Sequence, residues 1–444
     1  MDHLTRRGLL RSGLGLATAA ALRPATATAT PPAATATADW AAVRAQFSLA
    51  PGWAHMSTFF LVSHPRPVRE AIERHRRALD EDPYRTVERH MFEGPEHNLH
   101  LAVCRAAAEY LGGKAEEVAL TQSTTMGLGI VYQGLPLRPG HEVLLTEHDH
   151  VVHHEAARLA AERAGATVRR VALFDKFAEL PHLTPEALVA KVRAAIRPET
   201  RVVGLTWVHS QSGLKLPLRA MAAAVREANA GRAEADRALL VIDGVHGFGV
   251  EDETIAETGV DIFIAGTHKW IFAPRGTGLV WARPATWARL RPILPTFSSE
   301  ELFVAWMKGE KPPPTPKAAW FIPGGFHAYE HDWAMADAFA WHRALGRKRI
   351  ADRIHELNEA LKQGLSEMKH VTLHTPRGHA LSAGLVGFDV ASLEPEKAVL
   401  RLLEKKVIAS ASPYRRQVVR LSAGIMTTAW EIETALAAVR GLAA

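Results

Sequence analysis

Cysteine is almost absent from this chain. The 444 residues include one, Cys104, so the chain cannot form a disulfide bond with itself. Long hydrophobic runs are missing as well. The apolar run near the start, residues 9–22, is shorter than a membrane span and contains Gly13 and Gly15. The sequence therefore excludes a disulfide-stapled scaffold and predicts no stable membrane span.

A large excess of charge of one sign is also lacking. The net charge is +6, and residues 1–38 contribute four arginines against a single aspartate. The remaining charge is too small and too evenly spread to favour nucleic-acid binding. A hydrophobic content of 47% and a charged content of 23% are ordinary for a globular chain. The length suits two or three domains with a large core.

The first residues resemble a twin-arginine export signal. Arg6 and Arg7 precede the apolar run, and an Ala/Thr/Pro-rich tract ends at residues 36–38 in a small-x-small pattern that fits a cleavage site. The alternative is a disordered Ala/Thr tail. We expect residues 1–38 to be a signal peptide, which implies the twin-arginine export machinery as a partner and a periplasmic location.

From residue 118 onward, strand-like and helix-like segments alternate. Strands are expected at residues 118–121, 142–147, 167–173, 201–208, 238–242, 261–264 and 279–281. Because helices of crossover length separate most of them, we predict an α/β fold with a mostly parallel seven-stranded sheet covered on both faces. Sites in such sheets form at the carboxyl ends of the strands.

The pattern changes in the last third of the chain. Residues 311–317 are proline-rich and predict a rigid surface loop or an interdomain passage. A long amphipathic helix is expected over residues 331–368, with a break near Gly346, followed by short strands and a final helix. We therefore divide the chain into a signal peptide over 1–38, an N-terminal segment over 39–70 that packs on the small domain, a large domain over 71–320 that holds the sheet, and a smaller α+β domain over 321–444.

Lys269 is the most unusual residue of the sheet. It follows the apolar run 261–264, and a lysine at the end of a buried strand is costly unless its amine is used. Desolvation lowers the pKa of such an amine and allows it to form a Schiff base with an aldehyde. The alternative is a lysine whose amine extends to the surface.

Asp243 ends another very apolar strand, about one crossover before Lys269. The two side chains are therefore expected on neighbouring strand ends, which is what a pyridoxal ring bonded at both positions requires. A protonated pyridine nitrogen would keep the buried carboxylate ionised. The alternative is an aspartate that caps the next loop. His246, three residues on, could point to the phenolate oxygen of such a ring.

Two further segments lie at strand ends. Ser123-Thr124-Thr125 offers hydroxyls and backbone N–H groups at the start of a helix, which suits a phosphate; a simple helix cap is the alternative. Residues 148–154 include four histidines and invite a metal site, but their spacing is loose and no cysteine accompanies them. A histidine stacked on an aromatic cofactor needs only one of the four. We predict no metal.

This series of motifs resembles the class V aminotransferase fold of pyridoxal-phosphate enzymes. The resemblance covers roughly residues 50–440, and Thr267-His268-Lys269-Trp270 with the flanking residues 273–276 is most similar to the isopenicillin N epimerase-like branch. It implies fold type I, a homodimer and pyridoxal 5'-phosphate. The cofactor-binding residues that it implies are Ser123, Thr124, Thr125, His150, Ser210, Asp243, His246, Thr267, His268 and Lys269.

Within this resemblance, the residues take separate roles. Lys269 would carry the cofactor as a Schiff base, Asp243 would bind the ring nitrogen, and His150 rather than His148 would stack on the ring. The hydroxyls at 123–125 and the pair Thr267-His268 would face the phosphate.

Some positions depart from the family's pattern. Where many relatives have an asparagine near the ring oxygen, this chain has Ser210-Gln211, and where a Gly-Thr pair often meets the phosphate across the dimer it has residues 324–327. The substrate carboxylate would meet Arg415, Arg416 or Arg420, of which Arg420 fits the Arg-x-Ser run of relatives.

These expectations lead to one main function and several alternatives. The main one is an exported enzyme that acts at the α-carbon of an amino acid, or of a peptide or siderophore-like metabolite that contains one, by epimerisation, transamination or oxidative deamination. A cysteine-desulfurase-like or C–S lyase activity is disfavoured because Cys104 lies in an early helix, where it is expected to be a packed thiol. A non-catalytic binding relative and a metal binder based on residues 148–154 remain as the other readings.

Overall fold

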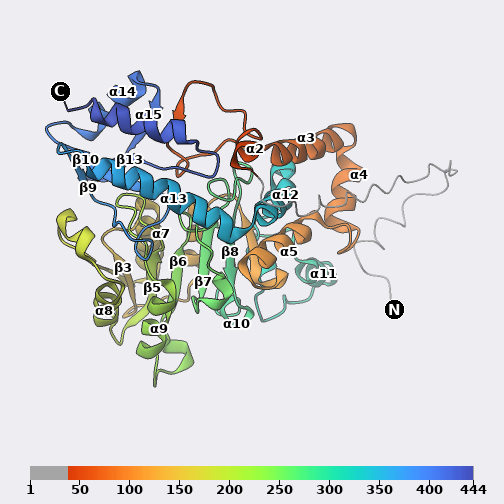
Figure 1. Ribbon diagram of the computed structural model, residues 1–444. Helices are drawn as coiled ribbons and strands as arrows, with labels where there is room; N and C mark the ends of the chain where they lie inside the picture. Colours follow the sequence, from red (N-terminus) through yellow and green to blue (C-terminus); the bar gives the residue numbers. More distant parts are fainter. Residues whose placement is uncertain (1–38, 444) are drawn as a thin grey trace.

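The structure is a computed structural model, and it describes residues 39–443. The expected export signal at residues 1–38 lies outside this described part. Figure 1 shows a large lower region built on one sheet and a smaller upper region that holds the last strands and helices. The long helix α13 (Arg347–Ser366) runs along the junction between the two.

The central sheet confirms the predicted α/β fold. Seven strands lie in the order β2-β8-β7-β6-β5-β3-β4, and β8 alone runs antiparallel to its neighbours. The strands are β2 (Val118–Thr121), β3 (Glu142–Thr146), β4 (Thr167–Val171), β5 (Thr200–Thr206), β6 (Leu239–Asp243), β7 (Ile262–Gly266) and β8 (Gly278–Ala282).

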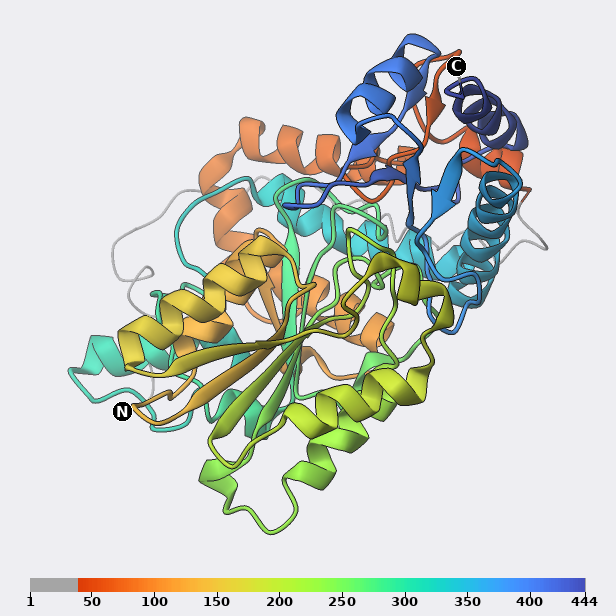
Figure 2. The same ribbon diagram turned by 90° about the vertical axis from the view of Figure 1, so that its left-hand side faces the viewer.

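Helices cover both faces of this sheet. The pair α6 (Thr124–Gly134) and α7 (Val151–Ala164) packs on one face, and the pair α8 (Pro185–Ala195) and α9 (Leu218–Ala228) packs on the other (Figure 2). Strands enclosed in this way need side chains that are apolar on both faces, which is why β6 and β7 are buried at every residue.

Further helices close the large region beside β2 and β8. Helix α12 (Tyr329–Leu345) packs on α3 (Arg66–Glu81) and α5 (Leu99–Leu111). Three elements were not expected from the sequence: α4 (Pro83–Val87), the π-helical turn at Glu88–Phe92, and α11 (Glu300–Lys308). Local signals for α11 exist, since Ser299 caps its first turn and Gly309 ends it at a positive φ of 65°. A short α10 (Pro284–Trp287) follows β8.

The smaller region is built on an antiparallel sheet. Its four strands lie in the order β12-β13-β10-β9. The elements of this region are β9 (Val371–Leu373), β10 (Val386–Val390), α14 (Pro395–Glu404), β11 (Val407–Ile408), β12 (Ser410–Ala411), β13 (Val419–Leu421) and α15 (Ala429–Arg440).

The N-terminal segment joins the smaller region. After α2 (Trp40–Arg44), strand β1 (Ala54–His55) pairs in parallel with β11, and Arg44 forms an ion pair with Glu431 of α15 at 3.2 Å. The long helix expected over 331–368 is interrupted at Gly346, which has a φ of 90° and separates α12 from α13.

Two hydrophobic cores meet along α13. Buried residues of this helix up to Ile354 pack in the larger core, which also holds the sheet and α12, whereas those from Leu357 onward pack with β10, β13 and α15. The domain limits drawn from the sequence stay predictions, because α12 shares its core with the sheet.

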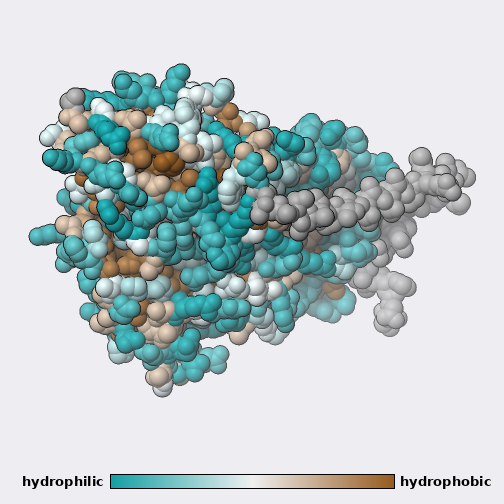
Figure 3. All heavy atoms as spheres, viewed as in Figure 1, coloured by the Kyte–Doolittle hydropathy of each residue, from teal (hydrophilic) through white to brown (hydrophobic). Residues whose placement is uncertain are grey.

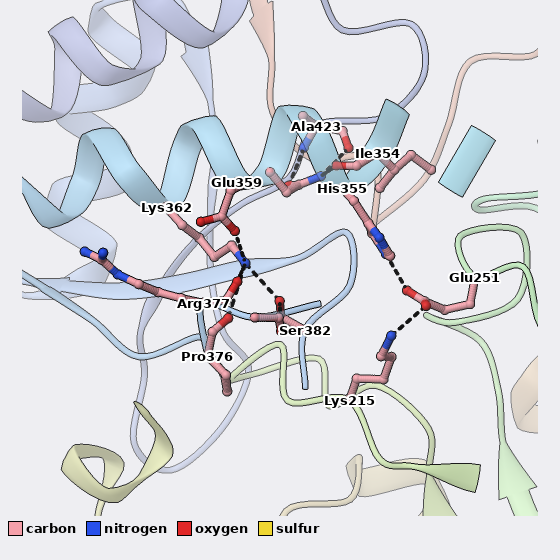
Figure 4. A network of polar contacts seen from close by, with 12 residues as sticks. Lys215, Glu251, Ile354, His355, Glu359, Lys362, Pro376, Arg377, Ser382 and Ala423 are labelled. Carbon is pink, nitrogen blue, oxygen red and sulfur yellow. Dashed lines mark hydrogen bonds and ion pairs between the residues drawn. The ribbon is translucent and has the colours of Figure 1, made fainter. Parts of the chain in front are cut away.

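Polar side chains also connect the two regions beneath α13. His355 of α13 and Lys215 of the loop before α9 both contact Glu251, at 2.8 and 2.6 Å (Figure 4). Burial would raise the pKa of Glu251, but the hydrogen bond from His355 and the charge of Lys215 hold it below its ordinary value. Glu251 therefore remains a carboxylate between two donors.

Among residues 39–443, no helix combines the length and the apolar character that a bilayer crossing needs. The face in Figure 3 is mostly hydrophilic, with small hydrophobic patches between polar side chains.

Candidate active site

A cavity of about 270 Å³ lies at the carboxyl ends of the central strands. The sequence-predicted residues that line it are Ser123, Thr124, Thr125, His150, Ser210, Asp243, His246, His268, Lys269 and Arg420. A larger cavity of about 460 Å³ opens beside α9 and α10 at the opposite end of the strands, and it contains none of them. The smaller cavity is therefore the candidate active site.

Lys269 lies in the turn after β7 rather than in the strand itself. The backbone fixes this turn, since the N–H of Phe272 donates to the carbonyl of Lys269 at 3.0 Å and that of Ala273 donates to the carbonyl of Thr267 at 3.1 Å. Phe272 has a φ of 59°, which is costly for a bulky residue and is often found next to functional sites. Trp270 is fully buried and holds the far side of the turn.

Lys269 is half-buried at the cavity, and its amine has few partners. Its Nζ lies 3.5 Å from Nε2 of His246. Burial lowers the pKa of Lys269 to about 8, although the carboxylate of Asp243 favours the charged form. Burial and the nearby cations, first among them Lys269, lower the pKa of His246 far below its ordinary value, so His246 is neutral. Lys269 is therefore close to the balance between ammonium and free amine near neutral pH.

Asp243 is the last residue of β6, next to β7, as predicted. Strands β6 and β7 pair in parallel, with Asp243 opposite Ile264. The carboxylate is buried, accepts one hydrogen bond from the N–H of Val245 at 3.2 Å, and has its pKa raised to about 6 by burial. A cationic group placed in the cavity would be the partner that this carboxylate needs.

The start of α6 faces the cavity and is tied to β7. The hydroxyl of Ser123 accepts from the N–H of Met126 at 3.1 Å and caps the helix. The hydroxyl of Thr124 accepts from the N–H of Gly266 at 2.7 Å. Because the first N–H groups of a helix have no partner within it, those of Thr124 and Thr125 can bind an anion. The cap and the anion site coexist here.

The four histidines at 148–154 separate in space. His150 lines the cavity, whereas His148 stacks on Phe174 with ring centroids 3.8 Å apart. His153 shares a 2.7 Å hydrogen bond with the phenol of Tyr132, and His154 contacts the carbonyl oxygen of Thr146 at 2.8 Å. Each ring has its own surroundings, so the four do not converge on one ion.

Arg420 reaches the cavity from β13 of the smaller region. Its guanidinium donates to the carbonyl of Ser210 at 2.8 Å and to the hydroxyl of Ser410 at 2.7 Å, and it lies 4.5 Å from the ring centre of Phe59. Burial lowers the pKa of Arg420 to about 10. Arg415 and Arg416 are exposed, and Arg416 pairs with Asp389 at 2.9 Å. Of the three arginines, only Arg420 lines the cavity.

Of the two remaining predicted residues, His268 lines the cavity and Thr267 does not. His268 lines it, with Nδ1 3.2 Å from the carbonyl oxygen of Thr277. Thr267 is fully buried outside the lining, and its hydroxyl shares a 2.6 Å hydrogen bond with that of Thr277. The structure thus does not bring the Thr267 hydroxyl into the cavity, because the β7–β8 connection uses it.

Sequence reasoning missed several lining residues. Phe59 and Phe60 come from the irregular N-terminal segment, Thr206 ends β5, and Pro413 lies between β12 and β13. The adjacent Tyr414 shares a 2.6 Å hydrogen bond with the hydroxyl of Ser210. Thr206 could have been found from its place at a strand end. The others have no local signal, because segments distant in sequence bring them there.

The donor set fits one kind of cofactor. A lysine with a lowered pKa, a buried carboxylate that accepts one backbone N–H, and N–H groups at a helix start suit an aldehyde, a protonated ring nitrogen and a phosphate. The fold and this site define a pyridoxal-phosphate-dependent enzyme of fold type I.

The comparisons with known proteins agree. The family model described as aminotransferase class-V matches residues 100–434, so the chain belongs to this family. It is 26% identical over 409 residues to isopenicillin N epimerase of Streptomyces clavuligerus, covering 90% of this chain and 97% of that protein. It is 22% identical over 355 residues to a probable cysteine desulfurase of Vibrio cholerae, covering 75% and 80%.

Solved structures show the same fold. A variant of C-DES with glycine covalently linked to the PLP cofactor has a TM-score of 0.76 and 22% identity, with 91% of this chain and 99% of that chain covered. The apo cysteine desulfurase of Thermococcus onnurineus has a TM-score of 0.75 and 18% identity, with 90% and 97% covered. Because the chain belongs to the class-V aminotransferase family and shares this fold, it is an enzyme whose cofactor is pyridoxal phosphate.

Proposed function

We propose that this enzyme acts at the α-carbon of an amino acid, or of a peptide or siderophore-like metabolite that contains one, by epimerisation, transamination or oxidative deamination. The observation that carries the proposal is the convergence of Lys269, Asp243 and Arg420 on one cavity. Similarity over nearly the whole of a curated isopenicillin N epimerase supports the same class of chemistry.

The residues of the cavity divide the work by their positions. Lys269 would hold the cofactor covalently, and its amine, once released, would move a proton at the substrate α-carbon. Asp243 would keep the ring nitrogen protonated. When bound, pyridoxal phosphate supplies an electron sink for the pair left at that carbon.

Other residues would bind and orient. The N–H groups of Thr124 and Thr125 would hold the phosphate, and His268 lies on the same side. His150 would cover the ring face. Arg420, whose guanidinium is fixed by Ser210 and Ser410, would bind the substrate carboxylate.

Exchange of the α-hydrogen provides the direct test. Holoenzyme in D₂O would be incubated with a panel of amino acids and short peptides, and deuterium at the α-carbon would be followed by NMR. We expect exchange with at least one substrate and none in Lys269→Ala. Inversion at the α-carbon would indicate epimerisation. Oxo-acid formation without oxygen uptake would indicate transamination, and oxo-acid formation with oxygen uptake would indicate oxidative deamination. Absence of exchange across the panel, with cofactor bound, would count against the proposal.

A C–S lyase or cysteine-desulfurase activity is the second candidate, and the cysteine desulfurases among the relatives favour it. Against it stands Cys104, the single cysteine, which is buried in α5 with its pKa raised to about 12 by burial. Release of sulfide from cysteine or cystine in the same assay, in the absence of α-hydrogen exchange on other substrates, would favour this candidate.

We also propose a homodimer. Phe60 lines the cavity although 69% of its surface is exposed, and a second copy of the chain would cover it. Light scattering on the purified protein should give twice the chain mass. A monomer at assay concentration would contradict this.

For the location, we propose export by the twin-arginine route, supported by the pattern at Arg6-Arg7 alone. Fractionation of cells that express the full chain should place it in the periplasm. Arg6→Lys combined with Arg7→Lys should retain it in the cytoplasm. If the wild type and the double variant are distributed equally between cytoplasm and periplasm, the twin-arginine route is excluded.

A further inference from the structure

A second cluster of ligand-type side chains lies outside the cavity. His100 is the second residue of α5, His327 precedes α12, and Asp332 lies in the first turn of α12. One nitrogen from each imidazole and one carboxylate oxygen lie within 4.8 Å of one another. We propose that these three residues form a binding site for a divalent transition metal, with zinc as its ion.

The hydrogen bonds around His327 support a cation at this point. Its Nδ1 lies 3.3 Å from the carbonyl oxygen of Gly325, to which an N–H at this nitrogen would donate. Its Nε2 lies 2.7 Å from Oδ2 of Asp332, and with the proton on Nδ1 two acceptors would meet there. In that tautomer a second proton or a metal ion is needed between Nε2 and Oδ2. A ligating histidine whose other N–H donates to a backbone carbonyl is the usual arrangement in metal sites.

His100 supplies an independent observation. Its Nε2 is buried, has no hydrogen-bond partner, and lies 3.7 Å from Oδ2 of Asp332. A second proton on His327 would satisfy Asp332 but would leave this nitrogen unpaired. A metal ion would satisfy all three groups.

The dimensions and surroundings suit zinc. With bonds of about 2.0–2.1 Å, ligand atoms around a tetrahedral ion lie about 3.3 Å apart, and the separations of 2.7 and 3.7 Å from Asp332 bracket this value, with all three atoms within 4.8 Å. Two imidazoles and one carboxylate disfavour Mg²⁺ and Ca²⁺, which prefer oxygen ligands alone. Buried Tyr329 and Trp333 pack beside the cluster, while the His327 side chain is 22% exposed, which leaves an entry path and room for water as the fourth ligand.

The site would connect three segments that the sequence alone does not bring together. A metal here fixes the loop at residues 324–328 to the starts of α5 and α12. The expectation of no metal was argued from residues 148–154, which lie elsewhere. The proposed ion is structural and independent of the cofactor.

Metal binding to the untagged holoenzyme tests the proposal. After dialysis against a chelator, the protein would be titrated with Zn²⁺ by calorimetry and with Co²⁺ by visible absorption, and the metal retained after purification would be measured by mass spectrometry. We expect about one ion per chain, a raised melting temperature, and a Co²⁺ spectrum with nitrogen ligands. His327→Ala should weaken binding by more than about tenfold.

Two variants make the result specific. Asp332→Asn should weaken binding as His327→Ala does, and circular dichroism would verify that both fold. His331→Ala is the matched control, because His331 is the neighbour of Asp332 but its Nδ1 contacts the carbonyl oxygen of Arg275 at 2.9 Å. It should bind as the wild type does. No binding by the wild type, or equal affinity in wild type and His327→Ala, would overturn the proposal.

Discussion

The active-site cavity and the polar network beneath α13 bury the same kinds of residue in opposite ways. Lys269 in the cavity has its Nζ 3.5 Å from one imidazole nitrogen. Lys362 in the network contacts the hydroxyl of Ser382 at 2.9 Å, the carboxylate of Glu359 at 2.8 Å, and two backbone carbonyls (Figure 4). The first lysine lacks partners that the second has.

The carboxylates differ in the same way. Asp243 accepts one backbone N–H, and burial raises its pKa to about 6. Glu251 lies between Lys215 and His355 and keeps a lowered pKa. Buried polar groups that have hydrogen-bond or ion-pair partners within the protein hold regions together. Buried polar groups with few such partners are typical of ligand-binding sites. Both places contain lysine, carboxylate and histidine side chains, so the cavity and the network differ in the partners of these groups and not in the residue types.

Replacement of the lysines should give the largest contrast. We expect Lys269→Ala to lower kcat by about 10³-fold or more, because the proton-transfer group is lost. Lys362→Met, the matched control, should keep kcat but lower stability. The measurements are steady-state rates and recovery of the cofactor on Lys269 after borohydride reduction. Comparable loss of kcat in both variants at equal folding would remove the distinction between the two lysines.

Glu251→Gln should break the network without touching the cavity. Removal of one charge from a buried set typically costs about 3 kcal/mol of unfolding free energy, and the side chain of Glu251 is only 6% exposed. Urea unfolding of the wild type and the variant measures the loss. The KM and kcat of the folded variant should stay close to the wild type. An unchanged urea midpoint would mean that the network contributes little.

Asp243→Asn should reduce activity by a smaller factor than the loss of Lys269. A hydrogen bond to a charged group contributes about 1.5–3 kcal/mol, so we expect a fall of about 10–100-fold in kcat. Burial raises the pKa of Asp243 to about 6 in the protein alone, and a protonated ring nitrogen would lower it, so the wild type should lose activity only as pH falls below about 6. The acid limb of the pH profile should disappear in Asp243→Asn. If the acid limb persists in Asp243→Asn, it reports the titration of a residue other than Asp243.

The pH dependence of cofactor uptake should show the smallest effect. With the pKa of Lys269 at about 8, the free-amine fraction rises about tenfold between pH 7 and 9. The rate at which apoenzyme takes up pyridoxal phosphate should rise through pH 8 and then level off. Mass spectrometry after borohydride should find the adduct on Lys269 and not on Lys362. A rate that continues to rise to pH 10 would indicate an ordinary lysine pKa.

The sequence was sufficient to place the central strands and helices along the chain, because the period and length of apolar runs are local properties. It did not reveal α4 or α11, which are only five and nine residues long and lie outside the alternation of strands and helices. The break at Gly346 was also predictable, since glycine alone accepts the φ of 90° at low cost. These features depend on neighbouring residues in the chain.

The site was determined in part by the sequence. Lys269, Asp243 and Ser123-Thr124-Thr125 could be placed together because parallel strands bring their carboxyl ends to one edge. Arg420, and His150 in preference to His148, followed from the family resemblance. Only the tertiary structure put Phe59 over that edge beside Arg420 and withdrew the Thr267 hydroxyl from it. Side-chain packing, which has no period along the chain, decides such contacts.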